Sequence, residues 1–316
     1  RYGRLPAQRE PQIGSFPKFS SRPTAELQIP VPYGHLTAKE WLPRPSEDPS
    51  RRLICLHGHQ DNAGSFDALL AELDPRWHAV ALEFTGHGLS AHLPRGCAYT
   101  IAQYTYDVMR AVRFLGWERF CLMGHSLGGL IAHHYANLFS DQVKKLVILD
   151  AFGPYFEQAS TVLERTRTGS LEFLRLDDKD ITSQPSYTGD QMVQLYAKTR
   201  FGFLPQDVDA LMKRGSRRMD DGRLVLTRDA RTRIASWTRM DRAELVEYMK
   251  GFKNEMLVVH AVPGLGYSVT CQKLVADICR ENCKAFEMVY VEGNHHVHMN
   301  RPDLVATHVG PFLERT

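Results

Sequence analysis

The sequence has 316 residues, of which 43% are hydrophobic and 24% charged, and its formal net charge is +3. Because this charge is small and no Lys/Arg run alternates with aromatic residues, we expect no nucleic-acid partner. No apolar stretch approaches the ~20 residues of a membrane-spanning helix, so we expect no membrane span.

Residues 1–26 are assigned to an N-terminal extension. Its first 23 residues are rich in Arg, Pro and Ser and contain one acid, Glu10. Such a composition is typical of an organellar transit region, so we expect a mitochondrial location, with a disordered tail in a cytoplasmic protein as the alternative. If the extension is ordered, we expect a protein partner to hold it, through the basic residues Arg4, Arg9, Lys18 and Arg22 and the apolar residues Tyr2, Leu5, Ile13, Phe16 and Phe19.

Strand and helix patterns alternate from residue 27 to residue 151. Two extended runs flank a turn at Gly34 and predict a hairpin. Four apolar strands follow, "RLICL", "HAVALEF", "RFCLMGH" and "KKLVILD", separated by helical patterns, one of which has Thr100 in a capping position. Continuous apolar strands that alternate with helices predict a mostly parallel sheet covered on both faces.

The alternation stops after the sixth strand and returns at residue 248. Residues 152–247 show amphipathic helices and polar turns, with only "RLVLTRD" extended, whereas residues 248–316 contain two more strand–helix pairs. The prediction is therefore an α/β core of residues 27–151 and 248–316, interrupted by a helical insertion that is long enough to form a lid.

The stretch "MGHSLGG" places Ser126 between a predicted strand and a predicted helix. Gly124 and Gly128 complete the pattern G-x-S-x-G, in which a tight strand-to-helix turn exposes the serine at the carboxyl end of the sheet. Glycine is expected at both positions because the neighbours of this turn pack too closely for a side chain. Ser126 is therefore the candidate nucleophile.

A serine nucleophile needs a base, and three histidines follow the last predicted strand in "VEGNHHVHM". His295 occupies the first loop position after that strand, so we assign it as the base. His298 is expected to be a packing or surface residue. We expect no metal site here, since no acid or cysteine alternates with the histidines.

The remaining members of the site are expected at other strand ends. The backbone N–H groups of His59 and Leu127 are the candidate oxyanion donors, and His57 is expected to order its loop. No acid follows the strand "EMLVVHA", and Asp277 lies too far along the next helix. Asp150, which closes the strand "KKLVILD", is the candidate catalytic acid, with a structural capping role as the alternative.

Together, the stretches "CLHGHQDNAGSFD", "GHGLSAH", "MGHSLGG", "KLVILD" and "EGNHHVHM" resemble the α/β-hydrolase fold and, within it, the serine hydrolase-like proteins. The resemblance runs from about Leu27 to the C-terminus and implies Ser126 as nucleophile, His295 as base, and His59 and Leu127 as oxyanion donors. The sequence departs from these relatives at two positions. They often have an aspartate near the position of Tyr267, and they tend to have a tryptophan where this sequence has His59. Haloalkane dehalogenases share the fold, but their reaction needs an aspartate nucleophile in place of the serine.

The leading hypothesis is a cofactor-independent serine hydrolase for carboxylic esters or similar acyl compounds. Its apolar acyl pocket is expected from aromatic residues of the lid, namely Phe152, Tyr155, Phe156, Phe201, Phe203 and Trp237. The alternative is an accessory or structural subunit of a larger, mitochondrial assembly, which the basic extension and the missing loop acid favour.

Overall fold

The computed structural model describes residues 22–151, 159–179, 184–199, 201–234, 242–265 and 269–315. The N-terminal extension therefore lies almost wholly outside the described residues, and so do Phe152, Tyr155, Phe156, Trp237 and Tyr267. Arg22 is described, and its guanidinium donates hydrogen bonds to the carbonyls of Trp41 and Trp77. The expectation that Arg22 faces a partner protein is thus wrong, because it binds its own domain.

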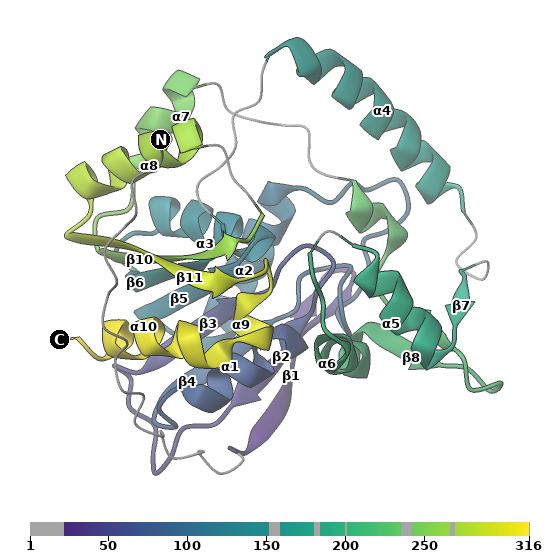
Figure 1. Ribbon diagram of the computed structural model, residues 1–316, viewed down its shortest axis with the longest axis horizontal. Coiled ribbons are helices and arrows are strands. Elements are labelled where there is room, and N and C mark those ends of the chain that lie inside the picture. Colours follow the sequence, from purple (N-terminus) through teal and green to yellow (C-terminus); the bar gives the residue numbers. More distant parts are fainter. Residues whose placement is uncertain are drawn as a thin grey trace, which may run out of the picture.

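Eight strands form the central sheet, in the order β1-β2-β4-β3-β5-β6-β10-β11 (Figure 1). The first two form the predicted hairpin and run antiparallel, β2 pairs antiparallel with β4, and all other neighbours are parallel. This confirms the mostly parallel sheet. The strands are β1 (Thr24–Val31), β2 (Gly34–Trp41), β3 (Arg52–Leu56), β4 (His78–Leu82), β5 (Phe120–His125), β6 (Val143–Leu149), β10 (Glu255–Pro263) and β11 (Ala285–Gly293).

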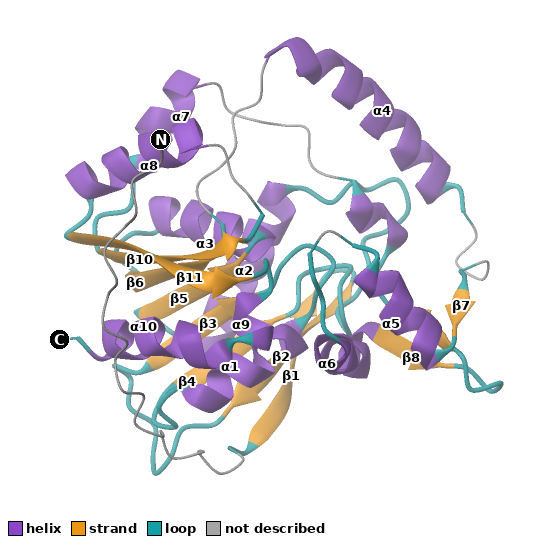
Figure 2. Cartoon of the chain, in the orientation of Figure 1, coloured by secondary structure: helices purple, strands orange, loops and turns teal. Residues whose placement is uncertain are grey.

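Helices cover both faces of the sheet (Figures 1 and 2). One face carries α2 (Ile101–Leu115), α3 (Leu127–Leu138), α7 (Arg242–Met249) and α8 (Val269–Asn282), and the other carries α1 (Asp67–Glu72), α9 (Val297–Asn300) and α10 (Pro302–Glu314). The short helix η1 (Ala63–Phe66) precedes α1. None of the described helices combines the length and hydropathy needed to cross a membrane.

Alternation along each strand explains the continuous apolar runs. In β3, Ile54 and Leu56 belong to the larger apolar cluster, whereas Leu53 and Cys55 belong to the cluster on the opposite face. Successive strand side chains point to opposite faces, so a sheet covered on both sides needs apolar residues at every position. Cys55 is fully buried as a free thiol.

The segment between β6 and β10 has its own small architecture, and we call its described residues 159–234 the inserted segment. A three-stranded sheet in the order β7-β9-β8 packs among its helices. These elements are α4 (Ala159–Asp177), β7 (Ser186–Tyr187), α5 (Gly189–Ala197), α6 (Pro205–Gly215), β8 (Ser216–Arg218), β9 (Leu224–Leu226) and the short helix η3 (Ala230–Arg233). The run "RLVLTRD" thus contains β9, as expected.

The expected lid boundary at residue 247 falls within α7. Leu245 and Met249 of this helix belong to the larger core cluster, and the Tyr248 hydroxyl lies 2.6 Å from Nδ1 of His134 on α3. By its contacts, α7 therefore packs with the sheet core and not with the inserted segment.

Candidate active site

Ser126 occupies a strained turn between β5 and α3. Its backbone has φ +50° and ψ −118°, a conformation that residues with a side chain rarely adopt. The turn is held on both sides, since the Ser126 N–H donates to the Leu149 carbonyl at 3.1 Å and the Ser126 carbonyl accepts from Leu130 N–H at 3.1 Å. The serine therefore stands at the carboxyl end of β5, beside the end of β6.

The two glycines of the motif have no room for a side chain. A Cβ on Gly124 would lie 2.2 Å from the Gly128 carbonyl oxygen, as the packing argument predicts. A Cβ on Gly128 would lie 2.0 Å from the carbonyl oxygen of Leu56, so this glycine is required by the end of β3 and not by Gly124. The turn is thus packed directly against the neighbouring strand.

Asp150 and His295 form a buried hydrogen-bonded pair. Asp150 follows β6 with φ +40°, and its Oδ2 lies 2.6 Å from Nδ1 of His295. The same carboxylate accepts hydrogen bonds from the backbone N–H groups of Ala261, at 3.1 Å, and Leu265, at 3.3 Å. Because an ionised carboxylate only accepts, Nδ1 of His295 carries the proton and Nε2 keeps its lone pair. The other acid considered, Asp277, lies on α8 in surface ion pairs.

Burial and charge set the ionisation of this pair. Burial lowers the pKa of His295 to about 4, although its bond to Asp150 opposes the shift. Burial alone would raise the pKa of Asp150, but hydrogen bonds from His260 and His295 outweigh it and hold that pKa well below its usual range. At neutral pH the imidazole is thus neutral and the carboxylate charged, as a general base and its orienting acid require.

Ser126 and His295 line one cavity of about 410 Å³. Residues of the inserted segment form much of its wall, including the aromatic residues Tyr187, Tyr196, Phe201 and Phe203 and the cationic residues Arg228 and Arg233. The nucleophile and the base candidates therefore come from the sheet core, whereas much of the surface available to a substrate comes from the inserted segment.

The oxyanion candidates lie at the ends of β3 and β5. Leu127 is the first residue of α3, where backbone N–H groups have no partner within the helix. His59 lines the cavity, and its Nε2 donates to the Thr232 carbonyl of η3 at 2.7 Å. Neighbouring His57 uses both ring nitrogens in its own loop, next to Gly58 O and Phe84 N, in keeping with the ordering role expected of it.

A family model described as the alpha/beta hydrolase fold matches residues 51–239. The chain belongs to the α/β-hydrolase family. It is 32% identical to a serine hydrolase-like protein of Danio rerio, over 93% of this chain and 89% of that protein. It is 32% identical to a probable serine hydrolase of Drosophila melanogaster, over 92% and 87% of the two chains. A solved hypothetical protein of Pseudomonas aeruginosa PAO1 superposes with a TM-score of 0.79 at 27% identity, covering 92% of this chain and 99% of that chain.

This α/β hydrolase also has polar residues around the pair that sequence reasoning missed. His260 on β10 places Nδ1 3.5 Å from Asp150 Oδ1. Asp61, in the loop after β3, has its carboxylate beside His125 and His296. Burial alone would raise the pKa of Asp61, but His296 and His125 outweigh it and hold that pKa well below its usual range. Asp61 follows the parallel strand β3, whereas His260 lies within β10, and only the fold brings either of them to the site.

Proposed function

We propose that the chain is a serine hydrolase that cleaves carboxylic esters or related acyl compounds through an acyl-enzyme. One observation carries the proposal: a charged, buried Asp150 orients His295 in the cavity that also contains Ser126 on its strained turn. The names of the curated relatives agree with a serine hydrolase.

The proposed reaction uses the residues in sequence. The Ser126 hydroxyl attacks the acyl carbon while His295 Nε2 takes its proton, and the backbone N–H groups of His59 and Leu127 stabilise the oxyanion. His295 then donates this proton to the leaving group, and the acyl group stays on Ser126. Water, activated by the same imidazole, releases the acid and restores the serine. Asp150 stabilises the imidazolium that forms in each half-reaction.

The cavity suggests which esters are favoured. The aromatic side chains of Tyr196, Phe201 and Phe203 suit an apolar acyl chain, as expected of Phe201 and Phe203. Arg228 adds a positive charge, and within the described part of the chain it forms no ion pair with a carboxylate, its Nη1 donating instead to the Tyr196 hydroxyl at 2.7 Å. We therefore include esters that carry an anionic group among the proposed substrates.

Hydrolysis of p-nitrophenyl esters tests the proposal. The purified chain should release p-nitrophenol with an initial burst, and mass spectrometry of the quenched protein should show the mass of one acyl group. Ser126→Ala should show neither the burst nor the adduct. Turnover by the variant at the wild-type rate would refute the proposed mechanism.

The accessory-subunit alternative gains no support from the described residues. The absence of an acid after the strand "EMLVVHA" favoured this alternative, but His295 has an acid partner in Asp150. The basic N-terminal extension also favoured it, and apart from residues 22–26 this extension lies outside the described residues.

A further inference from the structure

Asp61, His125 and His296 converge on one point at the wall of the cavity, and we call them the Asp61 cluster. Asp61 comes from the loop after β3, His125 ends β5, and His296 follows β11. Their exposed fractions are 3%, 1% and 2%, and one ligand atom from each lies within 4.8 Å of the other two. All three residues line the same cavity as Ser126.

The hydrogen bonds of His125 leave one ring nitrogen facing a carboxylate. Its Nε2 lies 2.8 Å from the His295 carbonyl, which can only accept, so Nε2 carries a proton. Its Nδ1 lies 3.5 Å from Asp61 Oδ2 and, among the described residues, is buried without a hydrogen-bond partner. If the imidazole is neutral, the lone pair of His125 Nδ1 faces a lone pair of the Asp61 carboxylate in a buried place. This arrangement is unfavourable unless a proton or a metal ion lies between the two atoms.

The distances from the Asp61 carboxylate to the two imidazoles suit a metal ion, and all three ligand atoms lie within 4.8 Å of one another. Asp61 Oδ2 lies 3.3 Å from His296 Nε2 and 3.5 Å from His125 Nδ1. In a tetrahedral zinc site with bonds of about 2.0–2.2 Å, neighbouring ligand atoms are separated by about 3.3–3.5 Å. Two imidazoles and one carboxylate are also ligands that zinc accepts, and three protein ligands leave a fourth position open.

We propose that Asp61, His125 and His296 bind one Zn²⁺ ion, whose fourth position faces the cavity that contains Ser126. His295, His296 and His298 have no acid among them, so the local sequence predicts no metal site. The acid comes instead from the loop after β3, 235 positions before His296 in the chain.

Zinc bound there should inhibit the serine reaction. The His295 ring centre lies 4.6 Å from that of His125 and 5.1 Å from that of His296. Proton transfer from Ser126 makes His295 cationic, and a divalent cation this close raises the energy of that state. Zinc binding itself is independent of the proposed function, and only this inhibition rests on it.

Titration of the full-length, chelator-treated protein with Zn²⁺ in a calorimeter tests the site. We expect one Zn²⁺ per chain in the wild type and at least about tenfold weaker binding in Asp61→Asn and in His296→Gln. His59→Gln is the matched control, since it removes a histidine from the same cavity but no ligand, and its affinity for Zn²⁺ should equal that of the wild type. Circular dichroism checks that each variant is folded.

Spectroscopy of the wild type with Co²⁺ keeps the test decisive if the ligand variants do not fold. Co²⁺ should give the intense visible bands of a tetrahedral site, and Zn²⁺ should displace them. Three results would overturn the proposal: no saturable binding, a pale octahedral spectrum, or unchanged affinity in both ligand variants. Any of them would show that a proton, and not a metal ion, lies between Asp61 and His125.

Ester hydrolysis, assayed with and without chelator, separates zinc binding from the proposed function. A chain that binds Zn²⁺ but hydrolyses no ester refutes the proposed function alone.

Discussion

The sheet core and the inserted segment are stabilised by different kinds of interaction. The core has two large apolar clusters, one on each face of the sheet. The inserted segment has one small cluster, to which the core contributes Met299 of α9. Its attachment to the core relies on polar contacts with the loops at the strand ends, including two buried arginines.

Arg214 of α6 forms the first attachment. Its Nε lies 2.7 Å from the Glu83 carboxylate beyond β4, and its guanidinium also binds Glu26 of β1. The side chains of Arg214 and Glu83 are 8% and 0% exposed, so the buried Glu83 carboxylate depends on Arg214 for compensation.

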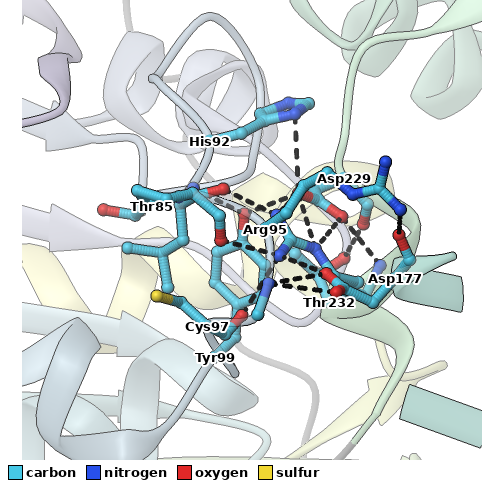
Figure 3. Close-up of polar contacts among 12 residues, drawn as sticks. Thr85, His92, Arg95, Cys97, Tyr99, Asp177, Asp229 and Thr232 are labelled. Carbon is cyan, nitrogen blue, oxygen red and sulfur yellow. Dashed lines mark hydrogen bonds and ion pairs between the residues drawn. The ribbon is translucent and has the colours of Figure 1, made fainter. Parts of the chain in front are cut away.

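Arg231 of η3 forms the second attachment, and Figure 3 shows its partners Asp177 and Asp229 together with Tyr99. Its guanidinium binds the carboxylates of Asp229, at 2.7 Å, and Asp177 of α4, at 2.9 Å, together with the Leu93 carbonyl of the core at 2.6 Å. The Tyr99 hydroxyl donates to Asp229 at 2.9 Å. One side chain thus connects two helices of the inserted segment to a core loop.

In the proposed function, the sheet core carries the catalytic residues and the inserted segment forms much of the substrate pocket. Ser126, His295 and Asp150 all belong to the core and are fixed by strand ends that the apolar clusters hold in place. The inserted segment supplies aromatic and cationic side chains that line the cavity, and its position depends on a few charged contacts. We therefore expect core substitutions to change the rate of the reaction, and substitutions in the inserted segment to change stability or selectivity.

The largest expected effect comes from the core. Asp150→Asn removes the charge that orients His295 and stabilises its imidazolium, so kcat should fall by about 10⁴-fold. Steady-state hydrolysis of a p-nitrophenyl ester measures this loss, and thermal denaturation checks that the variant remains folded.

Asp277→Asn is the matched control, because Asp277 lies in surface ion pairs on α8. It should retain wild-type kcat. A fall of less than about tenfold for Asp150→Asn would instead show that the chain works as a Ser–His dyad or not at all.

The second prediction separates the inserted segment from the core. Arg214→Met leaves the Glu83 carboxylate buried without its partner, and the free energy of unfolding should fall by about 3–5 kcal/mol. The double variant Arg214→Met/Glu83→Gln should recover much of that loss, since no buried charge is left uncompensated and the remaining Glu26 carboxylate is 52% exposed. Urea denaturation measures all three proteins.

Arg76→Met provides the comparison with an exposed pair. Arg76 binds Asp74 at the surface with 51% of its side chain exposed, so its loss should cost less than about 1 kcal/mol. Equal losses for the two arginines would contradict the claim that burial makes Arg214 important.

The smallest expected effect concerns selectivity. Arg228→Gln removes the cavity charge but touches neither Ser126 nor the Asp150–His295 pair. The ratio of kcat/KM for an anionic ester, the mono-p-nitrophenyl ester of succinic acid, to that for p-nitrophenyl butyrate should fall about two- to fivefold. The exposed Arg218→Gln should leave the ratio unchanged, and an unchanged ratio in Arg228→Gln would show that the anion preference is wrong.

The sequence predicts the core well because burial on both faces leaves a direct pattern. The parallel strands β3, β4, β5 and β6 appear as apolar runs, and Thr100 caps α2 as expected, its Oγ1 accepting from Gln103 N–H at 3.1 Å. Asp150 and His295 could be named for a similar reason, because parallel strands place their carboxyl ends at one edge of the sheet.

Long-range polar contacts could not be predicted in this way. Arg214 and Glu83 are 131 positions apart, and nothing in either local pattern indicates the other. Asp61 and His260 could not be identified for the same reason, since Asp61 interacts with histidines, and His260 with an acid, that lie on other strands or in the loops after them. Hydrophobic periodicity indicates which face of an element is buried, but it does not indicate which buried polar groups meet.

Labelling with a fluorophosphonate probe tests the central claim most directly, because the probe reacts readily with a serine that a neighbouring base activates. The wild type should be labelled, peptide mapping should place the adduct on Ser126, and Ser126→Ala should remain unlabelled while keeping the wild-type circular dichroism spectrum. Equal labelling of the wild type and Ser126→Ala, or no labelling of folded wild type, would contradict the account.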